Sequence, residues 1–74
     1  MSFDEAIMIV RSKCPNIYAQ WFADSAMDIA ETKGTPGLIE CANGIIKNIR
    51  NWHHPETQNV RKALQTFIKR HTDG

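Results

Sequence analysis

The chain of 74 residues has room for one hydrophobic core, which excludes a second independent domain. Apolar residues make up 42% of the sequence and charged residues 23%, a balance typical of folded chains and too apolar for intrinsic disorder. Nine basic and eight acidic side chains leave a formal net charge of +1, so overall charge gives no reason to expect binding to nucleic acid or to an anionic membrane.

The N-terminus, the length of the apolar runs and the number of cysteines indicate the cellular compartment. The N-terminus is acidic where a secretory signal is basic, and the longest unbroken apolar run is residues 6–10, so we expect no signal peptide and no membrane span. Cys14 and Cys41 are too few for the disulfide framework of a small secreted domain. We expect two reduced, largely buried thiols in a cytoplasmic protein, with a disulfide between them as the alternative. Because the chain begins with Met1, we also expect a complete stand-alone protein.

The first predicted helix covers residues 3–13. Ser2 is followed three residues later by Glu5, the pattern of a capping box in which each side chain satisfies an unpaired backbone N–H at a helix start. Pro15 cannot continue the helix because it lacks an N–H and clashes with the preceding turn. The positions expected to be buried lie at helical spacing and are Phe3, Ala6, Ile7, Val10 and Cys14.

The second predicted helix covers residues 16–33. It begins at Pro15 or Asn16 and ends before Gly34, the residue type most often found just past a helix end. Its apolar sector is broad enough to touch more than one neighbouring helix. The apolar positions are Ile17, Tyr18, Trp21, Phe22, Ala26, Met27, Ile29 and Ala30.

The third predicted helix covers residues 36–52 and follows the second almost directly, because Thr35 and Pro36 have the pattern of a cap and a first-turn proline. Gly44 inside this helix costs about 1 kcal/mol relative to alanine, which indicates that another group packs closely there. The apolar positions alternate at spacings of four and three, the strongest structural pattern in the chain. They are Leu38, Ala42, Ile45, Ile49 and Trp52, widened by Ile39 and Ile46.

The fourth predicted helix covers residues 55–71, with a frayed tail at 72–74. Its buried positions are expected to be Val60, Ala63, Leu64, Phe67 and Ile68. No segment shows the alternation of a β-strand. The sequence therefore predicts an all-α, single-domain bundle of four helical segments with short connections over residues 1–74. A domain this small is also a candidate for a homodimer.

Motifs for metal binding and catalysis are missing from the sequence. Adjacent His53 and His54 cannot easily chelate one ion, and the cysteines and histidines lack the close pairs of a structural zinc site. Nucleotide-binding and hydrolase signatures are absent, and so short a chain has little volume for a water-excluding pocket. We expect no cofactor, no metal and no enzymatic activity.

The charges divide unevenly along the chain. Residues 1–33 carry three basic and five acidic groups, whereas residues 34–74 carry six basic and three acidic groups. On the second predicted helix an acidic stripe recurs at helical spacing and comprises Gln20, Asp24, Asp28 and Glu31. On the third, a basic stripe comprises Asn43, Lys47, Arg50, Asn51 and His54.

The expected function is that of a small non-enzymatic regulator or inhibitor, which docks onto a larger protein or nucleoprotein assembly and occludes or bridges a site. The basic stripe is the first expected contact surface and the acidic stripe the second, with Tyr18, Trp21 and Trp52 as aromatic anchors. The alternative is a nucleic-acid-binding helical domain of the transcription-regulator kind, in which the basic stripe contacts phosphates and bases. Against this alternative, the turn between the second and third helices lacks the features of a helix-turn-helix.

Overall fold

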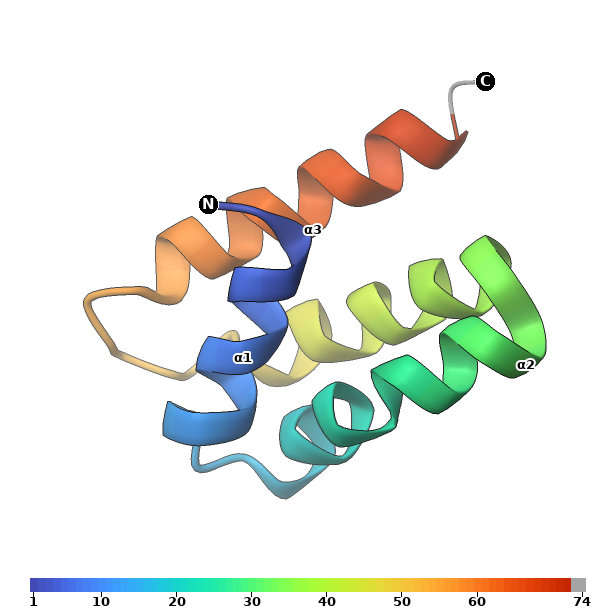
Figure 1. The fold of residues 1–74 in the computed structure, drawn as a ribbon. Helices are drawn as coiled ribbons and strands as arrows, with labels where there is room; N and C mark the ends of the chain where they lie inside the picture. The colour runs from blue at the N-terminus through green and yellow to red at the C-terminus, as the bar shows by residue number, and fades with distance from the viewer. Residues whose placement is uncertain (73–74) are drawn as a thin grey trace.

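Three helices account for the fold of residues 1–72, the part of the chain that the computed structural model describes (Figure 1). They are α1 (Phe3–Lys13), α2 (Ile17–Asn48) and α3 (Thr57–Thr72), and each contacts the other two. No strand is present among the described residues. The all-α class predicted from the sequence is confirmed.

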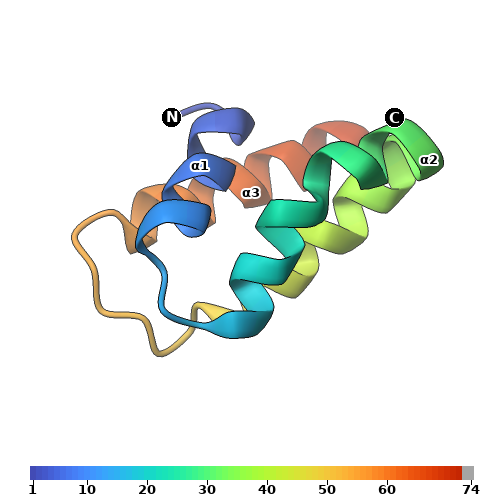
Figure 2. The ribbon, with the colours of Figure 1, turned by 60° about the horizontal axis from the view of Figure 1, so that its bottom comes forward.

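The structure has three helices where the sequence predicts four helical segments. The segments expected at 16–33 and 36–52 are joined in one element, α2, but the backbone of Gly34 is non-helical, so the break predicted at this glycine is present as a kink between two helical halves. Gly34 has φ 67° and ψ −155°, a backbone conformation that is essentially restricted to glycine. Figures 1 and 2 show the two halves of α2 folded back alongside each other. No loop separates them, because Thr35 and Pro36 restart the helix immediately after the glycine.

The second half of α2 is shorter than the prediction of 36–52. The helix ends at Asn48, and the N–H of Ile49 makes the closing bond to the Ile45 carbonyl at 3.0 Å. Residues 49–51 form a turn, so Trp52 lies beyond the helix.

The last helix begins at Thr57, two residues later than predicted. The Thr57 hydroxyl accepts the backbone N–H of His54 at 3.1 Å and donates to the Trp52 carbonyl at 2.9 Å, which holds the preceding turn in place. At the other end, α3 includes Thr72, the first residue of the predicted frayed tail, so this part of the prediction is wrong. Residues 73 and 74 lie outside the described residues.

The caps at the first two helix starts follow the sequence pattern closely. The Ser2 side chain accepts the N–H of Glu5 at 3.2 Å, as the capping box predicts. The Glu5 carboxylate accepts the Ser2 hydroxyl at 3.3 Å instead of a backbone N–H, so only one half of the reciprocal pair is formed. Asn16 caps α2, and its side-chain oxygen accepts the N–H of Ala19 at 2.9 Å.

The core lies between the three helices and agrees with the predicted stripes in α1, the second half of α2 and α3. Its fully buried large side chains come from all of these elements and the connections that follow them. They are Val10, Cys14, Cys41, Ile45, Ile49, Val60 and Leu64. Leu38, Ile46, Trp52 and Ile68 are partly buried and pack against this cluster.

The first half of α2 departs from the prediction, because alanines face the core. Ala19, Ala23 and Ala26 are buried, and Phe22 and Ile29 pack beside them. Ile17, Tyr18, Trp21 and Met27, which were predicted to belong to the apolar sector, are exposed. Small side chains let the neighbouring helices approach closely, so the larger apolar residues of this helix are not needed to fill the core.

Close approach between the halves of α2 also explains Gly44. A Cβ atom added there would overlap the ring of Phe22, which comes from the opposite half. The sequence prediction of close packing at Gly44 is confirmed. The contact fixes how the first half of α2 is rotated against the second half, and thereby which of its residues face solvent.

Candidate functional site

Large apolar side chains are exposed at the start of α2. Ile17 is 76% exposed, Tyr18 69% and Trp21 59%. Trp21 follows Ile17 by four residues and Tyr18 by three, and residues at these spacings lie next to each other on a helix surface. The Trp21 ring meets the Phe22 ring edge to face, with 5.1 Å between centroids, so the exposed indole rests on a side chain that packs against the core.

Three carboxylates continue the same side of α2 toward its kink. Asp24 follows Trp21 by three residues, Asp28 follows Asp24 by four, and Glu31 follows by another three. All three are exposed. We call this surface the aromatic–acidic face; it comprises Ile17, Tyr18, Trp21, Asp24, Asp28 and Glu31.

Gln20, the remaining member of the predicted acidic stripe, serves the local structure. Its side-chain amide donates to the Cys14 carbonyl just before α2, and the residue is half-buried. This bond ties the connection between α1 and α2 to the first turns of α2. The carboxylates of the stripe, by contrast, face solvent.

One edge of the aromatic–acidic face is formed by α1. The Arg11 Nε donates to the Asp24 carboxylate at 2.8 Å, in an ion pair of which both side chains are more than half exposed. Exposed pairs of this kind contribute little to stability, so the main effect of the bond is to place the two side chains. Met8, 66% exposed, lines a shallow hollow of about 280 Å³ with Arg11, Ser12 and Asp24.

The predicted basic stripe is not a single helix face. Asn43 and Lys47 are exposed on the second half of α2, but Arg50, Asn51 and His54 lie beyond its end at Asn48. The structure therefore places part of the stripe on a helix and part on the connection to α3. The basic stripe contains none of the large apolar side chains that are exposed in residues 1–72. These are Met1, Met8, Ile17, Tyr18, Trp21 and Met27.

His54 and Trp52 are engaged within that connection. Their rings stack with 4.9 Å between centroids and 23° between planes, and His54 Nδ1 accepts the N–H of Glu56 at 3.0 Å. Trp52 is half-buried against the core. Of the three predicted aromatic anchors, the structure thus presents Tyr18 and Trp21 to solvent, whereas Trp52 is half-buried.

Sequence reasoning misses one member of this face, Ile17, and two α1 residues at its edge, Met8 and Arg11. The sequence places Ile17 in a broad apolar sector, and its exposure has no signal of its own. Met8 falls outside the buried stripe of α1, which is a signal that it faces solvent. Arg11 carried no signal, because its pairing with Asp24 depends on how α1 crosses α2.

The two cysteines are free, buried thiols, so the alternative of a disulfide between them is wrong. The Cys41 Sγ donates to the Phe22 carbonyl at 3.0 Å, and burial raises the pKa of this thiol to about 11. A neutral thiol is a poor nucleophile. Cys41 therefore belongs to the packing between the halves of α2.

Within residues 1–72, no three His, Cys, Asp or Glu side chains gather closely enough to hold a metal ion. None of the three described helices combines the length and the apolar character needed to cross a bilayer. No protein-family model matches the chain, and comparisons with curated proteins and with solved structures yield no match either.

Proposed function

We propose that this protein is a non-enzymatic docking module that binds a larger protein through the aromatic–acidic face, and thereby occludes or bridges a site on it. The observation that carries the proposal is the exposure of Tyr18 and Trp21 beside Asp24, Asp28 and Glu31. Tryptophan and tyrosine are the residues most often found to dominate the free energy of protein–protein binding.

The charges of the face define the partner. Asp28 and Glu31 add negative charge to the turns that follow Trp21, and Asp24 is already paired with Arg11. A partner surface that complements this face has an apolar pocket for the Trp21 indole and carries Lys or Arg side chains at the edge of that pocket. Opposite charges of this kind increase the association rate and fix the orientation of the partners.

This face now takes precedence over the basic stripe as the proposed contact surface. The basic stripe lacks an exposed aromatic side chain, because Trp52 packs against the core. It is also divided between α2 and the following connection, where His54 is held by its own bonds. The aromatic–acidic face, in contrast, lies on one helix that the core holds from behind.

The test is affinity capture from cell lysate with three baits, each with and without nuclease: the unchanged chain, Tyr18→Ala with Trp21→Ala, and Lys47→Glu with Arg50→Glu. All four residues are exposed, so each variant should stay folded and keep its helical circular dichroism. The aromatic variant also loses the ring contact between Trp21 and Phe22, which should cost about 0.5–1.5 kcal/mol of stability. We expect the aromatic variant to lose the captured protein and the charge-reversed variant to keep it. Truncation of a hot-spot pair should weaken the measured affinity about 30-fold or more.

Two outcomes contradict the proposal. If the aromatic variant captures the same protein as the unchanged chain, the aromatic–acidic face is not the contact surface. If capture depends on Lys47 and Arg50 and disappears with nuclease, the chain binds nucleic acid through the basic stripe. Duplex binding that falls steeply with salt would then support that function.

A further inference from the structure

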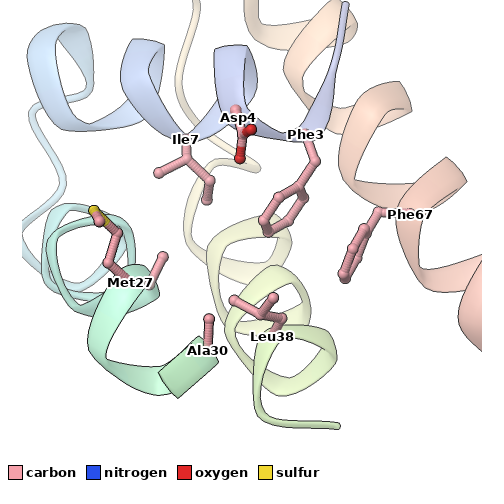
Figure 3. Close-up of a pocket in the computed structure, with 8 residues that line it drawn as sticks. Phe3, Asp4, Ile7, Met27, Ala30, Leu38 and Phe67 are labelled. Carbon is pink, nitrogen blue, oxygen red and sulfur yellow. The ribbon is translucent and has the colours of Figure 1, made fainter. Parts of the chain in front are cut away.

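A second candidate site lies at the opposite edge of the first half of α2. There α1, both halves of α2 and α3 line a cavity of about 380 Å³ that is open to solvent on one side (Figure 3). Its lining is apolar apart from one carboxylate and comprises Phe3, Asp4, Ile7, Ala26, Met27, Ala30, Leu38 and Phe67. The volume falls in the lower part of the range of about 300–1,000 Å³ that small-molecule sites occupy.

Packing against neighbouring residues fixes the side chains that line the cavity. The Phe3 and Phe67 rings stack with 4.1 Å between centroids, which joins α1 to α3, and Phe67 also packs on His71 at 4.5 Å. Ile7 and Ala26 are buried and form its inner surface. Met27 is 76% exposed at the rim, where a flexible thioether side chain can adapt to an occupant.

The only charged side chain of the lining is Asp4. It lies in the first turn of α1 next to Phe3, on the α1 side of the hollow (Figure 3). Among residues 1–72 the Asp4 carboxylate makes no ion pair and no side-chain hydrogen bond. A negative charge at the edge of an apolar, aromatic cavity favours a cation and disfavours an anion.

We propose that this cavity binds a small amphipathic cation with a compact apolar body and one ammonium group. The apolar body contacts Phe3, Leu38 and Phe67, and the ammonium group lies at the Asp4 carboxylate. The site is independent of the aromatic–acidic face, since the two share no residue.

The test uses two-dimensional ¹H–¹⁵N NMR titrations of the full chain with hexylammonium, hexanol and hexanoate, which share one chain length and differ in charge. We expect shifts concentrated at the lining residues and hexylammonium bound about fivefold more tightly than hexanol, the factor for a charge pair at about 4 Å in water. Hexanoate should bind more weakly than both.

Three variants locate the site. Asp4→Asn should abolish the preference for hexylammonium over hexanol, while the matched change Glu5→Gln, one residue along and outside the lining, should preserve it. Ala30→Phe should fill the hollow and abolish binding of all three probes. Because Ala30 is only half-buried, this variant should stay folded, as circular dichroism will show.

The proposal is overturned if no probe shifts the lining residues, if hexanoate binds as tightly as hexylammonium, or if the preference survives Asp4→Asn. It is also overturned if a folded Ala30→Phe variant binds the probes unchanged. None of these results bears on capture of a partner protein through Trp21, so the two proposals fail separately.

Discussion

Replacing Gly34 by alanine tests whether one residue sets the antiparallel path of α2. At φ 67° and ψ −155° an L-alanine is strained, although the added Cβ would meet only the Pro36 Cδ atom at 4.0 Å, an ordinary contact. The expected cost is therefore conformational, about 1–3 kcal/mol, reduced by about 0.4–1 kcal/mol because alanine restricts the unfolded chain more than glycine does. The net loss of about 1–2 kcal/mol is a large part of the roughly 4–11 kcal/mol expected for a chain of 74 residues.

The matched variant is D-alanine at the same position, in a chain made by chemical synthesis. Inverting the signs of the Gly34 angles gives φ −67° and ψ 155°, the polyproline II region of an L-residue, so a D-residue adopts the native angles without strain. D-alanine should stabilise the fold by about 0.4–1 kcal/mol through the unfolded state alone. Thermal and urea unfolding followed by circular dichroism should place the L-alanine midpoint about 4–16 °C below that of the glycine chain. Equal stability of the two alanine variants would refute the reasoning.

Two further predictions concern buried polar groups. The Cys41 thiol should resist alkylation at pH 8 in the folded chain and react in urea. As pH rises from 9 toward 11, the free energy of unfolding should fall, because the unfolded thiol loses its proton while the raised pKa keeps the folded thiol protonated. A Cys41→Ala chain should lack this decrease of stability with pH. If the decrease persists in that chain, the raised pKa does not belong to Cys41. Thr57→Val should cost about 1–3 kcal/mol, since buried Thr57 bonds both the His54 N–H and the Trp52 carbonyl, whereas Thr57→Ser should retain most of the stability. An unchanged urea midpoint for the valine variant would show that these bonds do not hold the turn.

Local signals in the sequence predict much of this fold. Ser2 and Asn16 cap the helices as expected, because a cap depends only on residues within one turn. The alternation of Ala42, Ile45 and Ile49 marks a buried face because one side of that helix is apolar and the other is polar. In such segments, periodicity alone indicates which side is buried.

The first half of α2 could not be predicted in the same way, because large apolar residues occur on both of its sides. Periodicity could not show whether Trp21 or Ala23 faces the core. The packing of Phe22 against Gly44 decides it, and that contact joins residues far apart in the sequence. Likewise, the turn that follows the end of α2 at Asn48 is held by bonds of the Thr57 hydroxyl to Trp52 and His54, which the periodicity of the helices does not contain.

The candidate site was predicted only in its parts. Tyr18, Trp21 and the three carboxylates were each singled out, but as an apolar anchor set and a separate charged stripe. That they share one surface follows from the rotation of the helix. The hollow beside Asp4 had no sequence signal at all, since its lining comes from four separate stretches of the chain.

The alanine side of α2 has a consequence for how this protein can vary. Alanine has no side-chain rotamers to lose on folding, so Ala19, Ala23 and Ala26 hold the helix in place without any loss of side-chain entropy. Tyr18 and Trp21, on the outer side, are largely exposed and contribute less to holding it. Mutations can therefore accumulate on the outer surface while the folded state stays largely populated. If the proposed docking function holds, such mutations would change the choice of partner without changing the buried alanines that hold the same helix in place.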